Sequence, residues 1–173
     1  MAIVIGAGLF VALSGGVDDD DQKGSTVIDY AGREVLIPEN LDNGIVTVGR
    51  LSALRWLAYF PAEMEKVKMI DVGIKTSIKE GALAYAYAYH DVLTAAETHS
   101  SDNLDDSENI VKLGPSLIIV NDSTYSAYKD ACESLSKLFP LAVIDTMGDL
   151  EGKGFWDKDY KLIDRFVNQA DLY

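Results

Sequence analysis

The sequence predicts an α/β fold, with a mainly parallel sheet, helices on both of its faces and a β-hairpin ahead of it. Three observations predict this class. Two short β-rich arms, "TVIDY" and "REVLI", flank an Ala-Gly turn near the start of the chain. Short apolar runs then recur along the sequence. Segments with helical periodicity lie between these runs, and buried strands that alternate with helices are typical of parallel sheets.

Local patterns predict each element in turn. The hairpin begins at Thr26 and is closed by Pro38. Apolar runs of strand length predict sheet strands at 44–49, 66–73, 116–122 and 141–148. Apolar stripes with a helical period predict helices at 51–60, 123–139 and 155–173, and a shorter helix follows a capping region at 105–107. Ser52 is the expected cap of the first helix.

The stretch "ALAYAYAYHD" at 82–91 places three tyrosines two residues apart. In an extended strand, residues at i, i+2 and i+4 share one face. The spacing therefore predicts a strand with Tyr85, Tyr87 and Tyr89 side by side, whereas a helix would scatter the rings around its axis. Such an aromatic wall suits either a core face or a ligand surface. We expect it at the carboxyl ends of the strands, where parallel sheets bind ligands.

Composition bounds the class of protein. The chain has 173 residues, of which 48% are hydrophobic, so one domain with a sizeable core is expected. The formal net charge is −13, and such a surface repels phosphate backbones, so we expect no nucleic-acid partner. The single cysteine, Cys132, has no partner for an intrachain disulfide and reads as a packed helix residue.

The N-terminal segment 1–17 carries an uncharged apolar run that is shorter than the roughly 20 residues of a comfortable membrane span. It has the length of the apolar region of a signal peptide, but the usual basic residues before it are absent. A true start upstream, a short membrane anchor and a buried first strand are the alternatives. We expect a signal or anchor segment at 1–17, an acidic linker at 18–25 and the folded lobe at 26–173.

Two motifs resemble the substrate-binding proteins of ABC importers, above all those for ferric siderophores, haem and cobalamin. The family opens on an Asp-x-x-Gly-Arg-x-Val-x-Ile-Pro hairpin. This chain matches it at Asp29, Gly32, Arg33, Val35, Ile37 and Pro38. A second motif, Glu-x-Ile-x-x-Leu-x-Pro-x-Leu-Ile-Ile, is matched at Glu108, Ile110, Leu113, Pro115, Leu117, Ile118 and Ile119. The resemblance covers residues 26 to about 165.

The resemblance implies one lobe of a two-lobed fold, with the ligand held in the cleft between the lobes. The ligand it implies is an iron chelate, haem or a corrinoid, captured outside the membrane and delivered to an ABC permease. The sequence ends at Tyr173, where the family's connecting helix is expected, so only the first lobe is recognised. A second lobe or a homodimer would complete the cleft. An envelope interaction or sensor domain without transport, and an inactive truncated fragment, are the alternatives.

Candidate ligand-binding residues lie mainly where predicted strands end. Arg50 and Ser52 follow one strand and would hold an anionic chelate at a helix N-terminus, although Arg50 equally suits a surface ion pair. Asn121, Ser123 and Tyr125 follow another strand, and capping of the next helix by Asp122 or Ser123 is the plainer interpretation. The tyrosines Tyr85, Tyr87 and Tyr89 would stack on a flat ligand, or else pack against this lobe or a second one.

The remaining candidates concern docking, metals and catalysis. Glu80 and Glu108 are the candidate permease-docking acids, because relatives dock through a glutamate on each lobe; Glu108 also suits a helix N-terminus on electrostatic grounds alone. His90 and His99 have no metal-ligand spacing and are expected to be exposed loop residues. No nucleophile–base motif or phosphate-binding loop is present, so we expect neither enzymatic activity nor a cofactor. The expected location is periplasmic or extracellular, with the membrane reached through the N-terminal segment.

Overall fold

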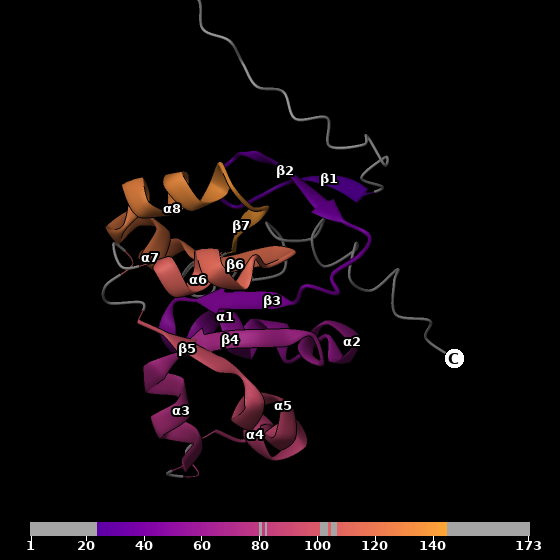
Figure 1. Cartoon of the computed structure of the whole chain (residues 1–173), viewed down its shortest axis with the longest axis vertical. Helices are drawn as coiled ribbons and strands as arrows, with labels where there is room; N and C mark the ends of the chain where they lie inside the picture. The colour runs from indigo at the N-terminus through magenta and orange to yellow at the C-terminus, as the bar shows by residue number, and fades with distance from the viewer. Residues whose placement is uncertain (1–23, 80, 82, 101–103, 105–106, 145–173) are drawn as a thin grey trace, which may run out of the picture.

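The computed structural model describes residues 24–79, 81, 83–100, 104 and 107–144 (Figure 1). The strands are β1 (Gly24–Ile28), β2 (Glu34–Pro38), β3 (Ile45–Val48), β4 (Val67–Asp71), β5 (Glu97–His99), β6 (Leu117–Asn121) and β7 (Leu141–Ile144). The helices are α1 (Arg50–Leu57), α2 (Pro61–Met64), α3 (Val72–Lys79), α4 (Tyr85–Ala88), α5 (His90–Ala95), α6 (Glu108–Leu113), α7 (Asp122–Ala127) and α8 (Lys129–Ser136).

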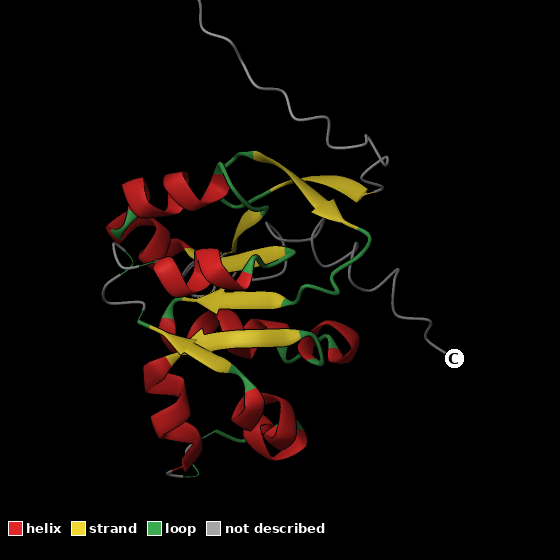
Figure 2. Ribbon diagram, viewed as in Figure 1, coloured by secondary structure: helices red, strands yellow, loops and turns green. Residues whose placement is uncertain are grey.

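Five of the strands form one sheet in the order β5-β4-β3-β6-β7, and every neighbouring pair is parallel. β1 and β2 form a separate antiparallel hairpin. Figure 2 shows helices in front of and behind the sheet. The predicted α/β class, with a mainly parallel sheet, helices on both faces and a hairpin ahead of it, is therefore confirmed.

Two apolar clusters lie on the two faces of this sheet. One contains buried residues of α1 to α5 together with the hairpin, and includes Trp56, Leu57 and Ile37. The other contains buried residues of α6, α7 and α8, among them Ile110 and Cys132. Successive strand residues point to opposite faces, so β3 supplies both clusters, which explains why its sequence is a continuous apolar run.

The hairpin turn covers the outer edge of β7. Asp29, which is 7% exposed, accepts hydrogen bonds from the backbone N–H of Val143 at 3.1 Å and from the Arg33 guanidinium at 2.7 and 3.0 Å. Arg33 also donates to the carbonyl of Leu141 at 2.9 Å, and the N–H of Tyr30 donates to the carbonyl of Val143 at 3.0 Å. Side chain and backbone of the turn thus pair an edge strand that would otherwise expose open hydrogen-bonding groups.

Several elements differ from the predicted ones. The segment at 85–88 is helical and Tyr89 is a turn residue, so the predicted strand there is wrong. The chain passes from β4 directly into α3, which was not predicted, and β5 was also missed. The helix predicted at 123–139 is two helices, separated at Tyr128, whose φ of −124° and ψ of 43° are not helical. β1 begins at Gly24, two residues before the predicted start of the folded lobe.

The predicted segment 1–17, most of the linker and the predicted helix at 155–173 lie outside the described residues. Within the described ranges, no helix combines the length and the hydropathy that a membrane crossing requires.

Candidate functional site

The strand order reverses direction between β3 and β6. From β3 the chain builds β4 and β5 on one side, then returns to place β6 and β7 on the other. The helix that follows β3, α1, packs on one face of the sheet, whereas α7, which follows β6, packs on the opposite face. The two connections therefore leave neighbouring strands toward opposite faces of the sheet. Ligands of open α/β sheets bind at such a switch point, at the carboxyl ends of the strands.

Gly49 and Asn121 meet at this switch point. Gly49 caps the N-terminus of α1 with a φ of 109°, a region that residues with a side chain rarely adopt. A Cβ atom built on Gly49 would lie 2.0 Å from Oδ1 of Asn121 and 3.0 Å from Oγ1 of Thr124. Only glycine therefore permits the β3–α1 turn to lie directly against the start of α7.

Asn121 is the capping residue of α7. Its Oδ1 accepts a hydrogen bond from the backbone N–H of Thr124 at 3.1 Å, and its Nδ2 donates to Oγ of Ser123 at 3.0 Å. The prediction that Asp122 or Ser123 caps this helix is wrong, because Asn121 holds that position. These two hydrogen bonds use both the oxygen and the nitrogen of the Asn121 amide. The residue is 6% exposed.

Arg50 and Ser52 lie in the first turn of α1, next to this contact. Arg50 is the first residue of the helix, and Gly49 rather than Ser52 occupies the capping position, so the capping role predicted for Ser52 is wrong. The side chains of Arg50 and Ser52 lie outside the described part of the structure. Their backbone follows Gly49, so the predicted positions at the ends of β3 and β6 are neighbours in space.

Tyr125 lies beside the edge but faces the interior. It is 9% exposed and belongs to the cluster on the α6–α8 face. The guanidinium of Arg33 lies 4.8 Å from the centre of its ring, which fits a cation–π contact. Tyr125 therefore links the hairpin turn to α7, and its ring packs in the interior beside the carboxyl ends of the strands.

The three tyrosines of the 85–89 segment are not at the carboxyl edge. α4 and α5 precede β5 and thus lie toward its amino end, where Figure 1 shows them below the sheet. The hydroxyl of Tyr89 donates to the carbonyl of Ala58, at the C-terminal end of α1, at 3.2 Å. Tyr85 packs against the core, whereas Tyr87 is 79% exposed. The expected aromatic wall on the rim is therefore wrong.

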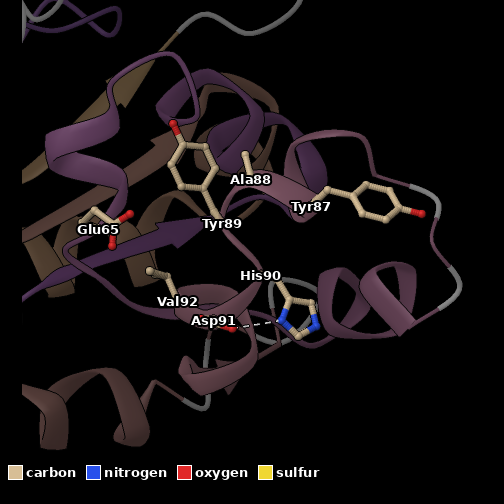
Figure 3. A pocket seen from close by; sticks show the side chains of 7 residues that line it. All are labelled: Glu65, Tyr87, Ala88, Tyr89, His90, Asp91 and Val92. Carbon is tan, nitrogen blue, oxygen red and sulfur yellow. Dashed lines mark hydrogen bonds and ion pairs between the residues drawn. The ribbon is translucent and has the colours of Figure 1, made fainter.

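Two shallow pockets adjoin these tyrosines. One, of about 320 Å³, is lined by Glu65 and residues 87–92, and the other, of about 260 Å³, lies between the end of α3 and α4. Tyr87 and His90 line both pockets. Figure 3 shows the rings of Tyr87 and Tyr89 pointing to different sides, and the imidazole of His90 beside Asp91, its hydrogen-bond partner at 3.2 Å. The aromatic side chains diverge and do not form one surface for a flat ligand.

Of the two candidate docking acids, the structure describes Glu108 but not Glu80. Glu108 is the first residue of α6 and is exposed, at the end of that helix where a negative charge is favoured. Glu80 lies outside the described residues. In the described ranges, no three histidine, cysteine or acidic side chains gather in a way that would hold a metal ion.

One feature of the edge was missed from the sequence. Four neighbouring strands each carry a buried polar residue near their carboxyl ends: His99 of β5, Asp71 of β4, Thr47 of β3 and Asn121 of β6, with exposed fractions of 6, 4, 1 and 6%. His99 was expected to be an exposed loop residue, which is wrong, whereas His90 is exposed as expected but begins helix α5 instead of lying in a loop. A polar residue that ends an apolar run is the sequence signal, visible in "VKMID" and "LIIVN".

Burial sets the ionisation of three groups. It raises the pKa of Tyr85 to about 12, against the opposing charge of Arg55, and raises that of the Cys132 thiol to about 11, against Arg33. It lowers the pKa of His99, more than the Thr47 carbonyl and the Asp71 charge raise it. All three groups are therefore neutral near pH 7, and none is a poised acid, base or nucleophile there.

Comparisons with known proteins bear on the fold. No protein-family model matches the chain, and no curated protein matches it significantly. Among solved structures, a periplasmic solute binding protein from Veillonella parvula DSM 2008 is similar, with a TM-score of 0.61 and 18% identity over 84% of this chain and 42% of that one. Holo-ViuP is similar with a TM-score of 0.54 and 14% identity, over 84% of this chain and 47% of its own.

The chain thus spans less than half the length of either structure. At these identities the likeness concerns the fold. The described residues have the fold of one lobe of a periplasmic binding protein.

Proposed function

We propose that this chain is the solute-binding lobe of an ABC importer, and that it captures its ligand without covalent chemistry at the switch point between β3 and β6. The observation that carries the proposal is the convergence of the β3–α1 and β6–α7 connections at Gly49 and Asn121. The fold shared with a periplasmic solute binding protein supports it.

The proposed ligand is an iron complex, namely a ferric siderophore or haem, or else cobalamin. This choice rests on the resemblance of the Asp29–Pro38 hairpin and the 108–119 segment to the proteins that bind those compounds. Backbone N–H groups in the first turn of α1 favour anionic oxygens, and Arg50, the first residue of that helix, would add a guanidinium. Ser123, which is exposed, would offer a hydroxyl contact from the neighbouring strand end, and Asn121, whose amide is engaged in the cap of α7, would hold that strand end in position.

We further propose that a second lobe, or a second copy of the chain, closes over this edge. A tight small-molecule site buries most of the ligand surface, and one lobe supplies half of such a site. Glu108 and Glu80 are the proposed contacts with the permease. The proposed location is the periplasm or the cell exterior, with the N-terminal segment at the membrane.

Calorimetric titration of the whole chain with ferric siderophores, haem and cobalamin tests the function. One ligand class is expected to bind. Asn121→Ala should weaken that binding by about tenfold or more, since 1.4 kcal/mol of lost interaction is a factor of ten. Tyr87→Ala, an exposed change at α4, is the matched control and should leave the affinity unchanged.

An absence of heat with every compound up to about 1 mM would count against transport. It would favour an envelope interaction or sensor domain that keeps the fold, or an inactive fragment. Equal loss of binding in Asn121→Ala and Tyr87→Ala would instead place the ligand elsewhere than the switch point.

A further inference from the structure

The guanidinium of Arg33 lies where three parts of the chain meet. Arg33 is the last residue before β2, at the end of the hairpin turn. Its Nε and Nη2 donate to Oδ2 of Asp29 at 3.0 and 2.7 Å, and Nη2 also donates to the carbonyl of Leu141 in β7 at 2.9 Å. Its Cζ lies 4.8 Å from the ring centre of Tyr125 in α7. One side chain thus connects the hairpin turn, the edge strand β7 and α7.

The hydrogen bonds fix the plane of this guanidinium. The carboxylate of Asp29 is itself held, because Oδ1 accepts from the backbone N–H of Arg33 at 2.9 Å and Oδ2 accepts from that of Val143 at 3.1 Å. The side chain of Asp29 has 0% exposure and that of Arg33 has 25%. A planar guanidinium with several fixed donors presents one defined face, which the compact ammonium of lysine does not offer. The hairpin turn and β7 therefore decide where this charged face lies.

Tyr125 carries that position to the start of α7. Tyr125 follows Thr124, whose backbone N–H donates to Oδ1 of Asn121 at 3.1 Å. Oγ1 of Thr124 and Oδ1 of Asn121 both lie within 3.0 Å of the point that a Cβ atom on Gly49 would occupy. The first turn of α7 therefore lies between the switch point on one side and the ring that Arg33 contacts on the other.

The contact depends on the face of the Tyr125 ring and not on its hydroxyl. A cation above an aromatic ring is attracted by the negative face of the π-system, and the attraction grows as the pair loses contact with water. Tyr125 is 9% exposed and packs in the cluster of the α6–α8 face. Phenylalanine would keep this attraction and leucine would remove it, which separates a positioning role from a ligand contact through the hydroxyl.

We propose that Arg33 is a positioning residue of the proposed ligand site: its guanidinium holds the ring of Tyr125 and so sets where the first turn of α7 lies against Gly49. The positioning is a property of the protein without ligand. Its consequence for affinity rests on the proposed function.

NMR of the whole chain tests the positioning directly. The Nε–H signal of Arg33 should be shifted upfield by the ring current in the wild type and in Tyr125→Phe, but not in Tyr125→Leu. The amides of Thr124 and Tyr128 donate to Asn121 and to the carbonyl of Thr124, so their exchange with solvent reports on α7. Their protection should fall about fivefold or more in Tyr125→Leu and in Arg33→Lys, the size expected of a partly desolvated cation–π contact.

Two further variants separate this effect from a general loss of stability. Tyr85→Leu is the matched control, because it removes a half-buried ring that packs on the opposite face of the sheet. It should leave the protection of the amides of Thr124 and Tyr128 unchanged. The double variant Arg33→Lys with Tyr125→Leu should lose no more protection than either single variant, because both changes remove the same contact.

The proposal is overturned if the two losses add in the double variant, or if Tyr125→Phe loses as much protection as Tyr125→Leu. Where Tyr125→Leu or Arg33→Lys fails to fold, the Arg33 Nε–H signal decides the matter. An upfield shift in both the wild type and Tyr125→Phe supports the proposal, and an unshifted signal in either one overturns it.

Titration with the siderophore, haem or cobalamin compound that the wild type binds tests the consequence for the site. Affinity should fall about fivefold or more in Tyr125→Leu and Arg33→Lys, in step with the loss of the contact, and remain unchanged in Tyr125→Phe. Unchanged affinity in all three variants would overturn the link between Arg33 and the ligand site. An absence of binding by the wild type counts against the proposed function alone, because the exchange measurement needs no ligand.

Discussion

The side-chain oxygen of Asn121 lies 2.0 Å from the point that a Cβ atom on Gly49 would occupy. The first turn of α7 therefore packs directly against the backbone of Gly49, at the start of α1. Gly49 also adopts a φ of 109°, so conformation and space demand glycine at the same position. The contact fixes how closely the two connections approach at the switch point.

Gly49→Ala should destabilise the protein by about 3 kcal/mol. About 1–2 kcal/mol comes from the positive φ and the rest from overlap with Asn121. Gly114→Ala is the matched control, because Gly114 has a φ of 62° and a Cβ there would meet nothing within 4 Å. The control should lose only the conformational part. Equal losses in chemical denaturation would mean that the contact with Asn121 carries no weight.

Asp29→Ala should cost about 3 kcal/mol, since it leaves Arg33 and the backbone N–H of Val143 without their buried acceptor. The comparison variant is Asp91→Ala, which removes a hydrogen bond with His90 in which both side chains are largely exposed. No measurable change is expected there. Urea denaturation of both variants decides the point, and a small effect for Asp29→Ala would show that the hairpin turn is not anchored to β7 as described.

Much of the fold follows from the sequence, because four sheet strands are continuous apolar runs and parallel strands buried on both faces require such runs. The tyrosine segment was misread because a Tyr-Ala alternation over four residues is too short to distinguish a strand from a single turn of helix. Alanine has the highest helix propensity, and packing of Tyr85 and Ala86 against the core decides between the two. β5 is three residues long and too short for a periodicity signal.

The candidate site was predictable in part. The ends of β3 and β6 were identified, because a polar or glycine residue follows each apolar run. Their contact across Gly49 and Asn121 depends on strand order, which no local pattern encodes. His99 was missed for the same reason, since its partner Thr47 lies 52 residues away along the chain and on a strand that is not its neighbour.

Tyr85→Phe and Tyr89→Phe should differ in sign. The hydroxyl of Tyr85 is buried without a hydrogen-bond partner among the described residues, so its removal should be neutral or stabilising. The hydroxyl of Tyr89 donates to the carbonyl of Ala58, and its removal should cost about 0.5–1.5 kcal/mol. Thermal and chemical denaturation of the two variants measure this difference. The reverse order would contradict the packing roles assigned to the two rings.

Cys132 should resist thiol reagents in the native state. It is 1% exposed, and burial raises the pKa of its thiol to about 11, so little reactive thiolate forms at pH 8. Because it is the single cysteine, absorbance from a disulfide reagent reports on this site alone. One equivalent should react in guanidinium and almost none in buffer. Rapid labelling of the native protein would show that the packing of α8 does not bury the Cys132 thiol.

The most direct measurement is an NMR map of the amides that shift when the bound member of the ligand panel is added. The account predicts that the largest shifts fall at 49–52 and 121–124, on both sides of the switch point, with little change at 85–92. Shifts centred on α4 and α5, with the ends of β3 and β6 unchanged, would contradict it.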